Sequence, residues 1–171
     1  MTDHVDLVRA AWQRERPDLD VRPQGVVGRL HRLANALTGE LVAVYRQHGL
    51  SEGEFDVLAT LRRSGAPYEL SAGSLAGQTM VTSGGMTKRL DALEKRGLVT
   101  RRAADTDGRG RVVGLTAAGR ELIDQAFTDH IANEHRLLSM ITPEQADELE
   151  ALPRAWLAGF ESPAPAKGLL G

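Results

Sequence analysis

Positively charged and hydroxyl side chains gather in one segment of this 171-residue chain, between Gly84 and Arg111. Eight residues of the segment are Lys or Arg and four are Asp or Glu, whereas the whole chain has a formal charge of −2. Lys and Arg bind phosphate oxygens and guanine acceptors, and hydroxyl groups reach phosphates or base edges. The segment therefore predicts a nucleic-acid surface, and the acidic total argues against a histone-like binder, which would be basic overall.

Seven residues are candidates for contact with double-stranded DNA. Ser83 and Thr87 carry short hydroxyls suited to phosphates or base edges, and Lys88 and Arg89 could reach phosphates or guanine in the major groove. Gly84 would allow close approach to a groove or a phosphate, although close packing on the preceding helix would explain it equally well. A solvated charged face is the alternative for the basic residues. The candidates are Ser83, Gly84, Thr87, Lys88, Arg89, Arg109 and Arg111.

A glycine-rich turn carries the last two candidates. Residues 105–111 are polar and lie between two segments, 98–102 and 111–115, that have the pattern of strands. The sequence therefore predicts a β-hairpin with arginines at its tip. Arg109 lies between two glycines and is the best candidate for insertion into a minor groove, where narrow A·T segments concentrate negative potential.

The basic helix that precedes this hairpin is amphipathic. We expect it to begin at Thr82 or Ser83. Met86, Leu90 and Leu93 are four and three residues apart, so they share one side of the helix and pack into the domain. The polar candidates are left on the outward side.

Shorter elements come before the basic helix, in the order of a winged helix-turn-helix. Residues 51–54 match a capping box and begin a helix. A short strand at 68–70, a small helix at 72–78 and a turn at 79–82 follow. The predicted fold class is mainly α with a small β-hairpin wing, a winged helix-turn-helix.

Long helices are predicted on both sides of this domain, over 3–15, 23–49 and 116–139 and from Thr142 onward. Pro153 should kink the last of them at a cost of about 3 kcal/mol unless packing compensates. Their long apolar faces predict a homodimer, which would double the contacts to a palindromic site, and an intrachain bundle is the alternative. The predicted domains are an extra N-terminal helix at 1–20, a helical dimerisation region at 21–50 and 116–161, a winged helix-turn-helix at 51–115 and a flexible tail at 162–171.

Other classes of protein fit the sequence poorly. The chain has no cysteine, which excludes thiolate chemistry and cysteine-based zinc sites. It has no run of eighteen apolar residues, so we expect a soluble, cytoplasmic protein without a membrane partner. No nucleophile with a nearby base, phosphate loop or carboxylate pair stands out, and His130 and His135 are five apart, which does not suit a metal pair on a helix. We therefore expect no enzymatic activity, no metal and no cofactor.

Four short motifs together resemble the MarR family of winged-helix transcription regulators. They are Leu75-Ala76, the run LDALEKRGLV at 90–99, DGRGR at 107–111 and LTAAG at 115–119. The resemblance covers about residues 23–160. It implies a triangular homodimer whose terminal helices pair and whose winged helices each read half of a pseudo-palindrome. Most members of the family repress transcription until a small anionic or phenolic ligand weakens DNA binding.

The N-terminal segment resembles the extra helix of the urate-responsive, PecS-like subgroup. In that subgroup a tryptophan, an aspartate and two arginines form the ligand site, and Trp12, Asp56, Arg63 and Arg101 match them in type and order. Arg102 is an adjacent alternative to Arg101. The resemblance thus implies a small anionic effector, either urate or a carboxylate such as aconitate or citrate.

The residues allow a physical reading of this ligand site. Asp56 and Arg63 are seven apart and so share one helix face, about 10 Å from each other. An arginine can hold a planar anion with two hydrogen bonds, and Trp12 could cover a flat ring. A packing role for Trp12 and a solvated charged pair are the alternatives. A DNA-binding regulator or architectural protein without an effector is the rival function, and repression and activation both stay open.

Overall fold

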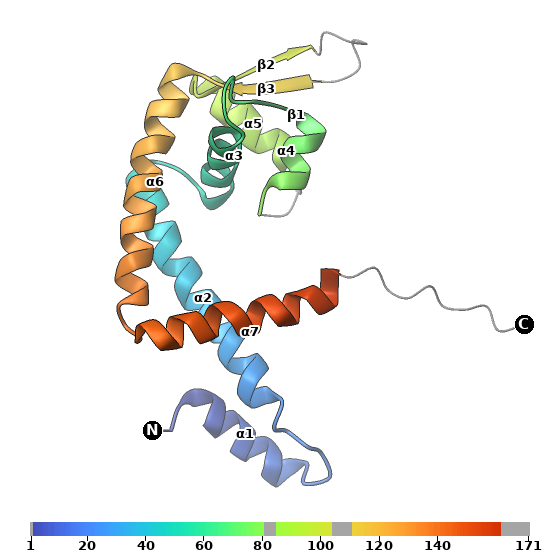
Figure 1. The fold of residues 1–171 in the computed structure, drawn as a ribbon. Coiled ribbons are helices and arrows are strands. Elements are labelled where there is room, and N and C mark those ends of the chain that lie inside the picture. The colour runs from blue at the N-terminus through green and yellow to red at the C-terminus, as the bar shows by residue number, and fades with distance from the viewer. Residues whose placement is uncertain (1, 81–84, 104–110, 162–171) are drawn as a thin grey trace, which may run out of the picture. The chain divides into compact units, whose positions relative to one another are not determined.

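A computed structural model describes residues 2–80, 85–103 and 111–161 of the chain. It divides into two compact units, Met1–Ile131 and Ala132–Gly171, and each is described here by itself (Figure 1). The first unit contains the two N-terminal helices and the winged helix. The second contains the last turns of one long helix and the C-terminal helix.

Helix α1 (His4–Glu15) packs on the first half of α2 (Gln24–Gln47). Asp3 caps α1 by accepting hydrogen bonds from the backbone amides of Val5 and Asp6 at 2.8 and 3.0 Å. Arg29 of α2 then donates to the carboxylates of both Asp3 and Asp6, at 2.8 and 2.7 Å. These ion pairs tie the start of α1 to α2, with Val5 buried between the helices.

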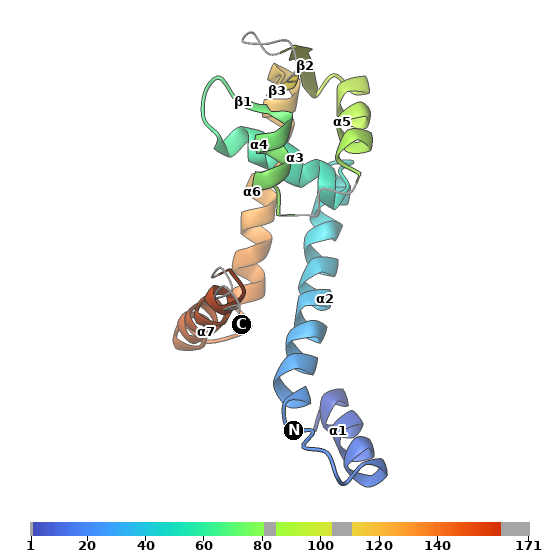
Figure 2. The same ribbon diagram turned by 90° about the vertical axis from the view of Figure 1, so that its right-hand side faces the viewer.

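The middle of the first unit is a winged helix-turn-helix (Figure 2). Its elements are α3 (Glu52–Arg63), β1 (Glu69–Ser71), α4 (Ala72–Gln78), α5 (Met86–Lys95), β2 (Val99–Ala103) and β3 (Arg111–Leu115). Among the described residues the strands form one antiparallel sheet in the order β1-β3-β2, with Val113 opposite both Leu70 and Arg101. The expected hairpin wing is confirmed, and β1 adds a third strand to it.

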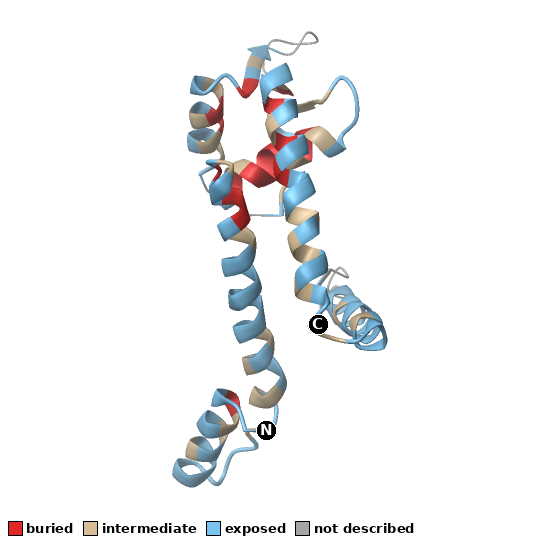
Figure 3. Cartoon of the chain, turned by 90° about the vertical axis from the view of Figure 1, so that its left-hand side faces the viewer, coloured by how far each residue is buried: buried red, intermediate tan, exposed pale blue. Residues whose placement is uncertain are grey.

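Helix α3 forms the centre of the buried core. The capping box expected at its start is confirmed, because Ser51 accepts from the amide of Glu54 and the Glu54 carboxylate accepts from the amide of Ser51. Val57, Leu58 and Leu61 are fully buried, and they belong to the same cluster as Leu75 and Leu93. Buried positions concentrate here, whereas residues 31–40 of α2 are all exposed (Figure 3).

Helix α6 (Ala117–Leu138) begins against Gly97 and Leu98, the residues between the end of α5 and the start of β2. The Thr116 hydroxyl accepts from the amide of Gly119 at 2.9 Å and donates to the carbonyl of Gly97 at 2.7 Å. A Cβ atom on Gly119 would lie 1.9 Å from the carbonyl oxygen of Leu98. The first turn of α6 can therefore approach the domain this closely only because residue 119 has no side chain.

The second unit contains helix α7 (Pro143–Glu161), with Pro153 inside it. Thr142 and Gln145 exchange hydrogen bonds that cap its start. Several large apolar side chains on α7 are exposed, namely Leu149, Leu152, Trp156, Leu157 and Phe160. No helix in the described part of the chain is long and apolar enough to cross a membrane.

One expectation about local structure was wrong. The basic helix α5 begins at Met86, not at Thr82 or Ser83, because Gly85 is its N-cap with φ +83°, a left-handed conformation that favours glycine. Gly85 therefore does not lie inside a helix. The fold also brings together residues far apart in the sequence, because His48 Nε2 lies 2.8 Å from the Asp129 carboxylate on α6, 81 positions away.

The close approach at Gly119 leads to a stability prediction. Gly119→Ala should lower the free energy of unfolding by about 2 kcal/mol, because the new methyl group meets a backbone carbonyl that cannot rotate away. Gly73→Ala on α4 is the matched control, since a Cβ there has open space. Adding a helix-favouring alanine at 73 should raise stability by up to about 1 kcal/mol. Urea unfolding measures both, and equal effects at the two sites would contradict the packing argument.

The ion pairs of α1 lead to a prediction about pH. Hydrogen bonds from Arg29 hold the pKa of Asp3 and of Asp6 below the ordinary value of 3.8. Carboxyls with a lowered folded-state pKa contribute stability above the ordinary value and lose it as the pH falls through the lowered value. The docking of α1 should therefore persist down to pH 3.8 and weaken below it.

The fluorescence anisotropy of Trp12, measured in a Trp156→Phe background, reports this docking. The substitution leaves Trp12 on α1 as the single tryptophan of the chain. Arg29→Met should give low anisotropy already at neutral pH and no further acid step. If the acid step is the same with and without Arg29, the step has another origin.

Candidate DNA interface and effector site

The outward face of α5 carries part of the predicted DNA-binding set. Thr87 and Lys88 are exposed, whereas Leu90 and Leu93 on the other side of the helix are buried in the core. The predicted division of the helix into a buried and a polar side is therefore confirmed. Ser83 and Gly84 lie outside the described residues.

Arg89 lies differently from Lys88. Its side chain is half-buried and packs on α3, where a Cβ on Gly53 would lie 2.2 Å from Arg89 Nε. A glycine at 53 thus leaves the room that the arginine stem occupies. This contact could not be predicted from local sequence patterns, because the two residues are 36 positions apart.

Arg111 begins β3 and is exposed, whereas Arg109 lies outside the described residues. A hollow of about 380 Å³ lies between the helices and the sheet, and Thr87, Leu90, Arg101 and Arg111 are among its lining residues. The structure therefore brings Thr87 of α5 and Arg111 of the wing to the same hollow. Two of the predicted DNA-binding side chains thus border one hollow.

Arg101 ties the wing to α5. Its guanidinium lies 2.5 Å from the Glu94 carboxylate and 2.7 Å from the Asp91 carboxylate, and its side chain is only 19% exposed. The hydrogen bonds with Glu94 and then with Asp91 raise the pKa of Arg101, and Arg101 lowers the pKa of Glu94. Arg101 therefore neutralises two acidic groups on the helix that would read DNA.

Arg102 points to the opposite face of the sheet, as the alternation of a strand requires. It donates to the Glu69 carboxylate on β1 at 2.8 Å. A Cβ on Gly114, which lies between them on β3, would come within 3.0 Å of the Glu69 stem. Thus Arg102 binds the edge strand β1, whereas its neighbour Arg101 binds α5.

Asp56 and Arg63 are in contact, although the spacing along the helix suggested a separation of about 10 Å. Arg63 Nη1 lies 3.9 Å from Asp56 Oδ1, and Asp56 is buried, with 8% of its surface exposed. The arginine side chain folds back along the helix, which closes the gap. Arg63 also donates from Nη2 to the backbone carbonyl of Gln78 at the end of α4.

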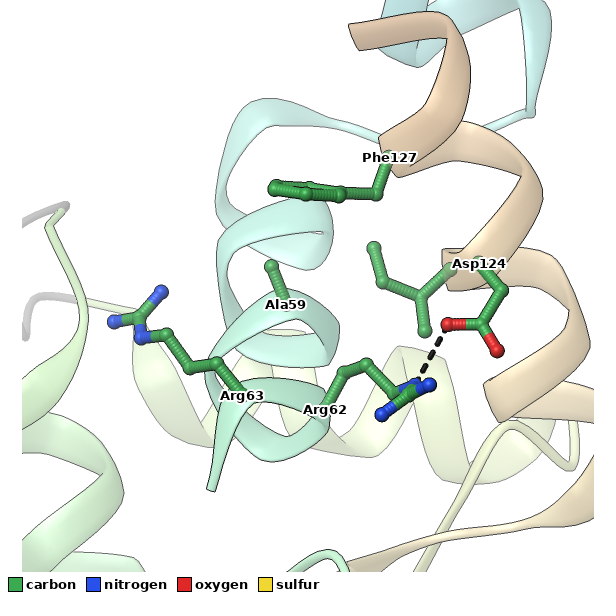
Figure 4. Close-up of a pocket in the computed structure, with 6 residues that line it drawn as sticks. Ala59, Arg62, Arg63, Asp124 and Phe127 are labelled. Atoms are coloured by element: carbon green, nitrogen blue, oxygen red, sulfur yellow. Dashed lines mark hydrogen bonds and ion pairs between the residues drawn. The ribbon is translucent and has the colours of Figure 1, made fainter. Parts of the chain in front are cut away.

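A cavity of about 300 Å³ lies between α3 and α6 (Figure 4). Phe127, Ile123 and Ala59 give it an apolar lining, and two arginines at the end of α3 border it. Arg62 pairs with Asp124 at 2.6 Å, while the guanidinium of Arg63 points away from that pair (Figure 4). The cavity has the size for a small planar molecule and a cation at its edge.

Trp12 lies apart from the other predicted effector residues of the same chain. It is 47% exposed on α1, which packs on the first half of α2, whereas α3 follows the end of α2 (Figure 2). Of the four predicted ligand residues, Asp56 and Arg63 are in contact with each other, whereas Arg101 of β2 forms its ion pairs with α5. The sequence prediction did not include Phe127 and Asp124, since residues so far along the chain give no local sign that they meet α3.

Comparisons with known proteins agree with this architecture. A model described as MarR family matches residues 48–110. The HTH-type transcriptional regulator PecS of Dickeya dadantii is 40% identical over 147 residues, which are 86% of this chain and 88% of PecS. The transcriptional repressor MprA of Escherichia coli is 31% identical over 120 residues, 68% of this chain and 65% of MprA.

A solved structure shares the fold. It is that of a MarR family transcriptional regulator from Streptomyces coelicolor in complex with DNA, with a TM-score of 0.75 and 24% identity, covering 85% of this chain and 91% of that one. The resemblance that the sequence motifs indicated is confirmed by the match to PecS over most of both chains. This chain belongs to the MarR family of winged-helix transcription regulators and is similar to PecS.

Proposed function

We propose that this chain is a repressor that binds a pseudo-palindromic operator as a homodimer and leaves it when a small planar anion, such as urate, binds. The observation that carries the proposal is the exposed face of α5 with Thr87 and Lys88, beside Arg111 of the wing, in a chain of the MarR family. PecS is a transcriptional regulator and MprA is a transcriptional repressor, and the similarity to MprA supports repression. Such a regulator acts on the chromosome, which in a bacterium places it in the cytoplasm.

The proposed DNA contacts follow from residue type and position. Lys88 and Arg111 supply charge to phosphates, and Thr87 supplies a hydroxyl to a phosphate or a base edge. Arg89 joins α5 to α3 and would act on DNA partly by holding the helix in place. Ser83 and Gly84, which precede the reading helix in sequence, and Arg109, which lies between the two wing strands in sequence, complete the set from the sequence alone.

The proposed homodimer is supported by apolar side chains that each unit leaves exposed. Val26, Val27, Leu33 and Leu37 are exposed on α2 in the first unit. The described part of α7 in the second unit exposes a row of apolar residues from Leu149 to Phe160. Apolar surface of this extent on helices usually marks a protein interface. Residues 21–50 and 116–161 would then dimerise, while 51–115 bind DNA.

The proposed effector site is the end of α3. An anion of planar shape could take two hydrogen bonds from Arg63 and lie against the apolar wall formed by Phe127 and Ala59. It would compete with Asp56 for the same guanidinium and repel that carboxylate. Trp12 and Arg101 enter the proposal through the resemblance to the urate-responsive subgroup.

The DNA part of the proposal is tested by fluorescence anisotropy with a labelled duplex from the region upstream of the chain's own gene. Lys88→Ala and Arg111→Ala should each weaken binding and each reduce the dependence of log K on log salt by about 1, because one phosphate contact is lost. Arg16→Ala is the control, since that side chain pairs locally with Asp18, outside the regions proposed to bind DNA and to dimerise. Binding should saturate at two chains per duplex. Unchanged salt slopes for both variants would remove α5 and the wing from the interface.

The effector part is tested by titrating the complex with urate at fixed salt, with aconitate and citrate in parallel. Urate should release the duplex from the wild-type chain. Ala59→Leu should abolish the release and keep DNA affinity, because it fills the cavity without touching α5, while the exposed Ala118→Leu should respond like wild type. Release by a carboxylate alone would reassign the effector, and no release by any anion would favour a regulator without one.

A further inference from the structure

The last residue of α3 reaches across to the last residue of α4. Arg63 donates from Nη2 to the backbone carbonyl of Gln78, and its Nη1 lies 3.9 Å from the buried Asp56 carboxylate. One guanidinium therefore has an anchor on α3 and a contact on α4. Figure 4 shows this side chain extending from the end of α3, away from Arg62.

The contact satisfies a group that the helix itself leaves unpaired. The last four carbonyls of an α-helix have no intrahelical partner, and the C-terminal end of the helix dipole favours a cation. A guanidinium supplies both the donor and the charge, and its rigid fork can serve Asp56 and Gln78 together. The Asp56 carboxylate holds the guanidinium of Arg63 on α3, the most buried helix of the core. The contact with Gln78 therefore fixes the position of α4 relative to α3.

The end of α4 is the point from which the chain leaves for the reading helix. Thr79, the C-cap of α4, donates from its amide to the carbonyl of Leu75 and from its hydroxyl to the carbonyl of Ala76. Met80 follows and is 91% exposed, so side-chain packing adds little there. The chain thus leaves for Gly85, the N-cap of α5, from a fixed segment of backbone. Several hydrogen bonds, including the one from Arg63, hold that segment in place.

We infer that Arg63 is a positioning residue for DNA reading, which holds the end of α4 and thereby the start of the turn into α5. The inference deepens the proposed function and rests on it. An anion in the cavity beside Arg63 would compete for the guanidinium with the Gln78 carbonyl, which now accepts its hydrogen bond, and with the Asp56 carboxylate, which now forms an ion pair with it. Effector binding would then loosen the turn through this one side chain.

A ligand role alone predicts something different for the same residue. If Arg63 only held the anion, Arg63→Ala would lose the response to the anion and keep full DNA binding. If Arg63 instead touched a phosphate, the variant would lose affinity for every duplex and its salt slope would fall by about 1. A positioning role predicts a loss that is confined to sequence-specific binding.

The experiment compares wild type, Arg63→Ala, Arg63→Lys and Arg62→Ala on the upstream duplex and on a scrambled duplex, over a series of salt concentrations. Arg62→Ala is the matched control, because that neighbour pairs with Asp124 on α6. Arg63→Ala should lower affinity for the specific duplex about tenfold and leave the scrambled duplex and its salt slope unchanged, as expected for the loss of a charged hydrogen bond. Arg63→Lys should recover part of the loss, and Arg62→Ala should keep the ratio of the two affinities.

A second measurement does not depend on the folding of any variant. Amide hydrogen exchange at Thr79 and Met80 of the wild-type chain should become faster when urate is added. An unchanged affinity ratio in Arg63→Ala, or unchanged exchange at 79–80 under urate that does release DNA, would overturn the inference. A wild-type chain that does not prefer its upstream duplex would contradict the proposed function itself, and the inference with it.

Discussion

The burial of α3 is the constraint on which the rest of the first unit depends. From Gly53 to Leu61 most of its residues are buried, and the helix packs against α2, α4, α5 and β3. Because it contacts each of these elements, its position fixes the distance between the long helices and the reading head. The buried Asp56 carboxylate of this helix pairs with Arg63 at its end, and Arg63 borders the cavity between α3 and α6.

Several arginines in this domain form ion pairs that join one element of the protein to another. Arg101 binds acidic residues of α5, Arg102 binds β1 and Arg62 binds α6. Lys88 and Arg111 remain exposed on the side of the reading helix and the wing. The count of positive charges between 84 and 111 therefore overstates the charge that DNA would meet, because acidic partners in the fold neutralise part of it.

Local rules predicted the helices and their ends well. The capping box at Ser51 and the small helix over 72–78 both follow from residues within a few positions of each other, and the structure contains both of them. The start of α5 was placed too early, since residue type alone does not tell a glycine inside a helix from one at its N-cap. The sign of φ at Gly85 decides this, and the surrounding turn sets that sign.

The sequence by itself determined the winged helix-turn-helix, the family and the face of α5 that is polar, because these depend on periodicity and short motifs. Only the tertiary structure decided the partners of the long charged side chains. An arginine reaches several ångströms in any of many rotamers, so its partner depends on which element folds beside it. For that reason the approach of Arg89 to Gly53, the pairing of Arg101 with Glu94 and the contact of Arg63 with Gln78 could not be predicted from spacing.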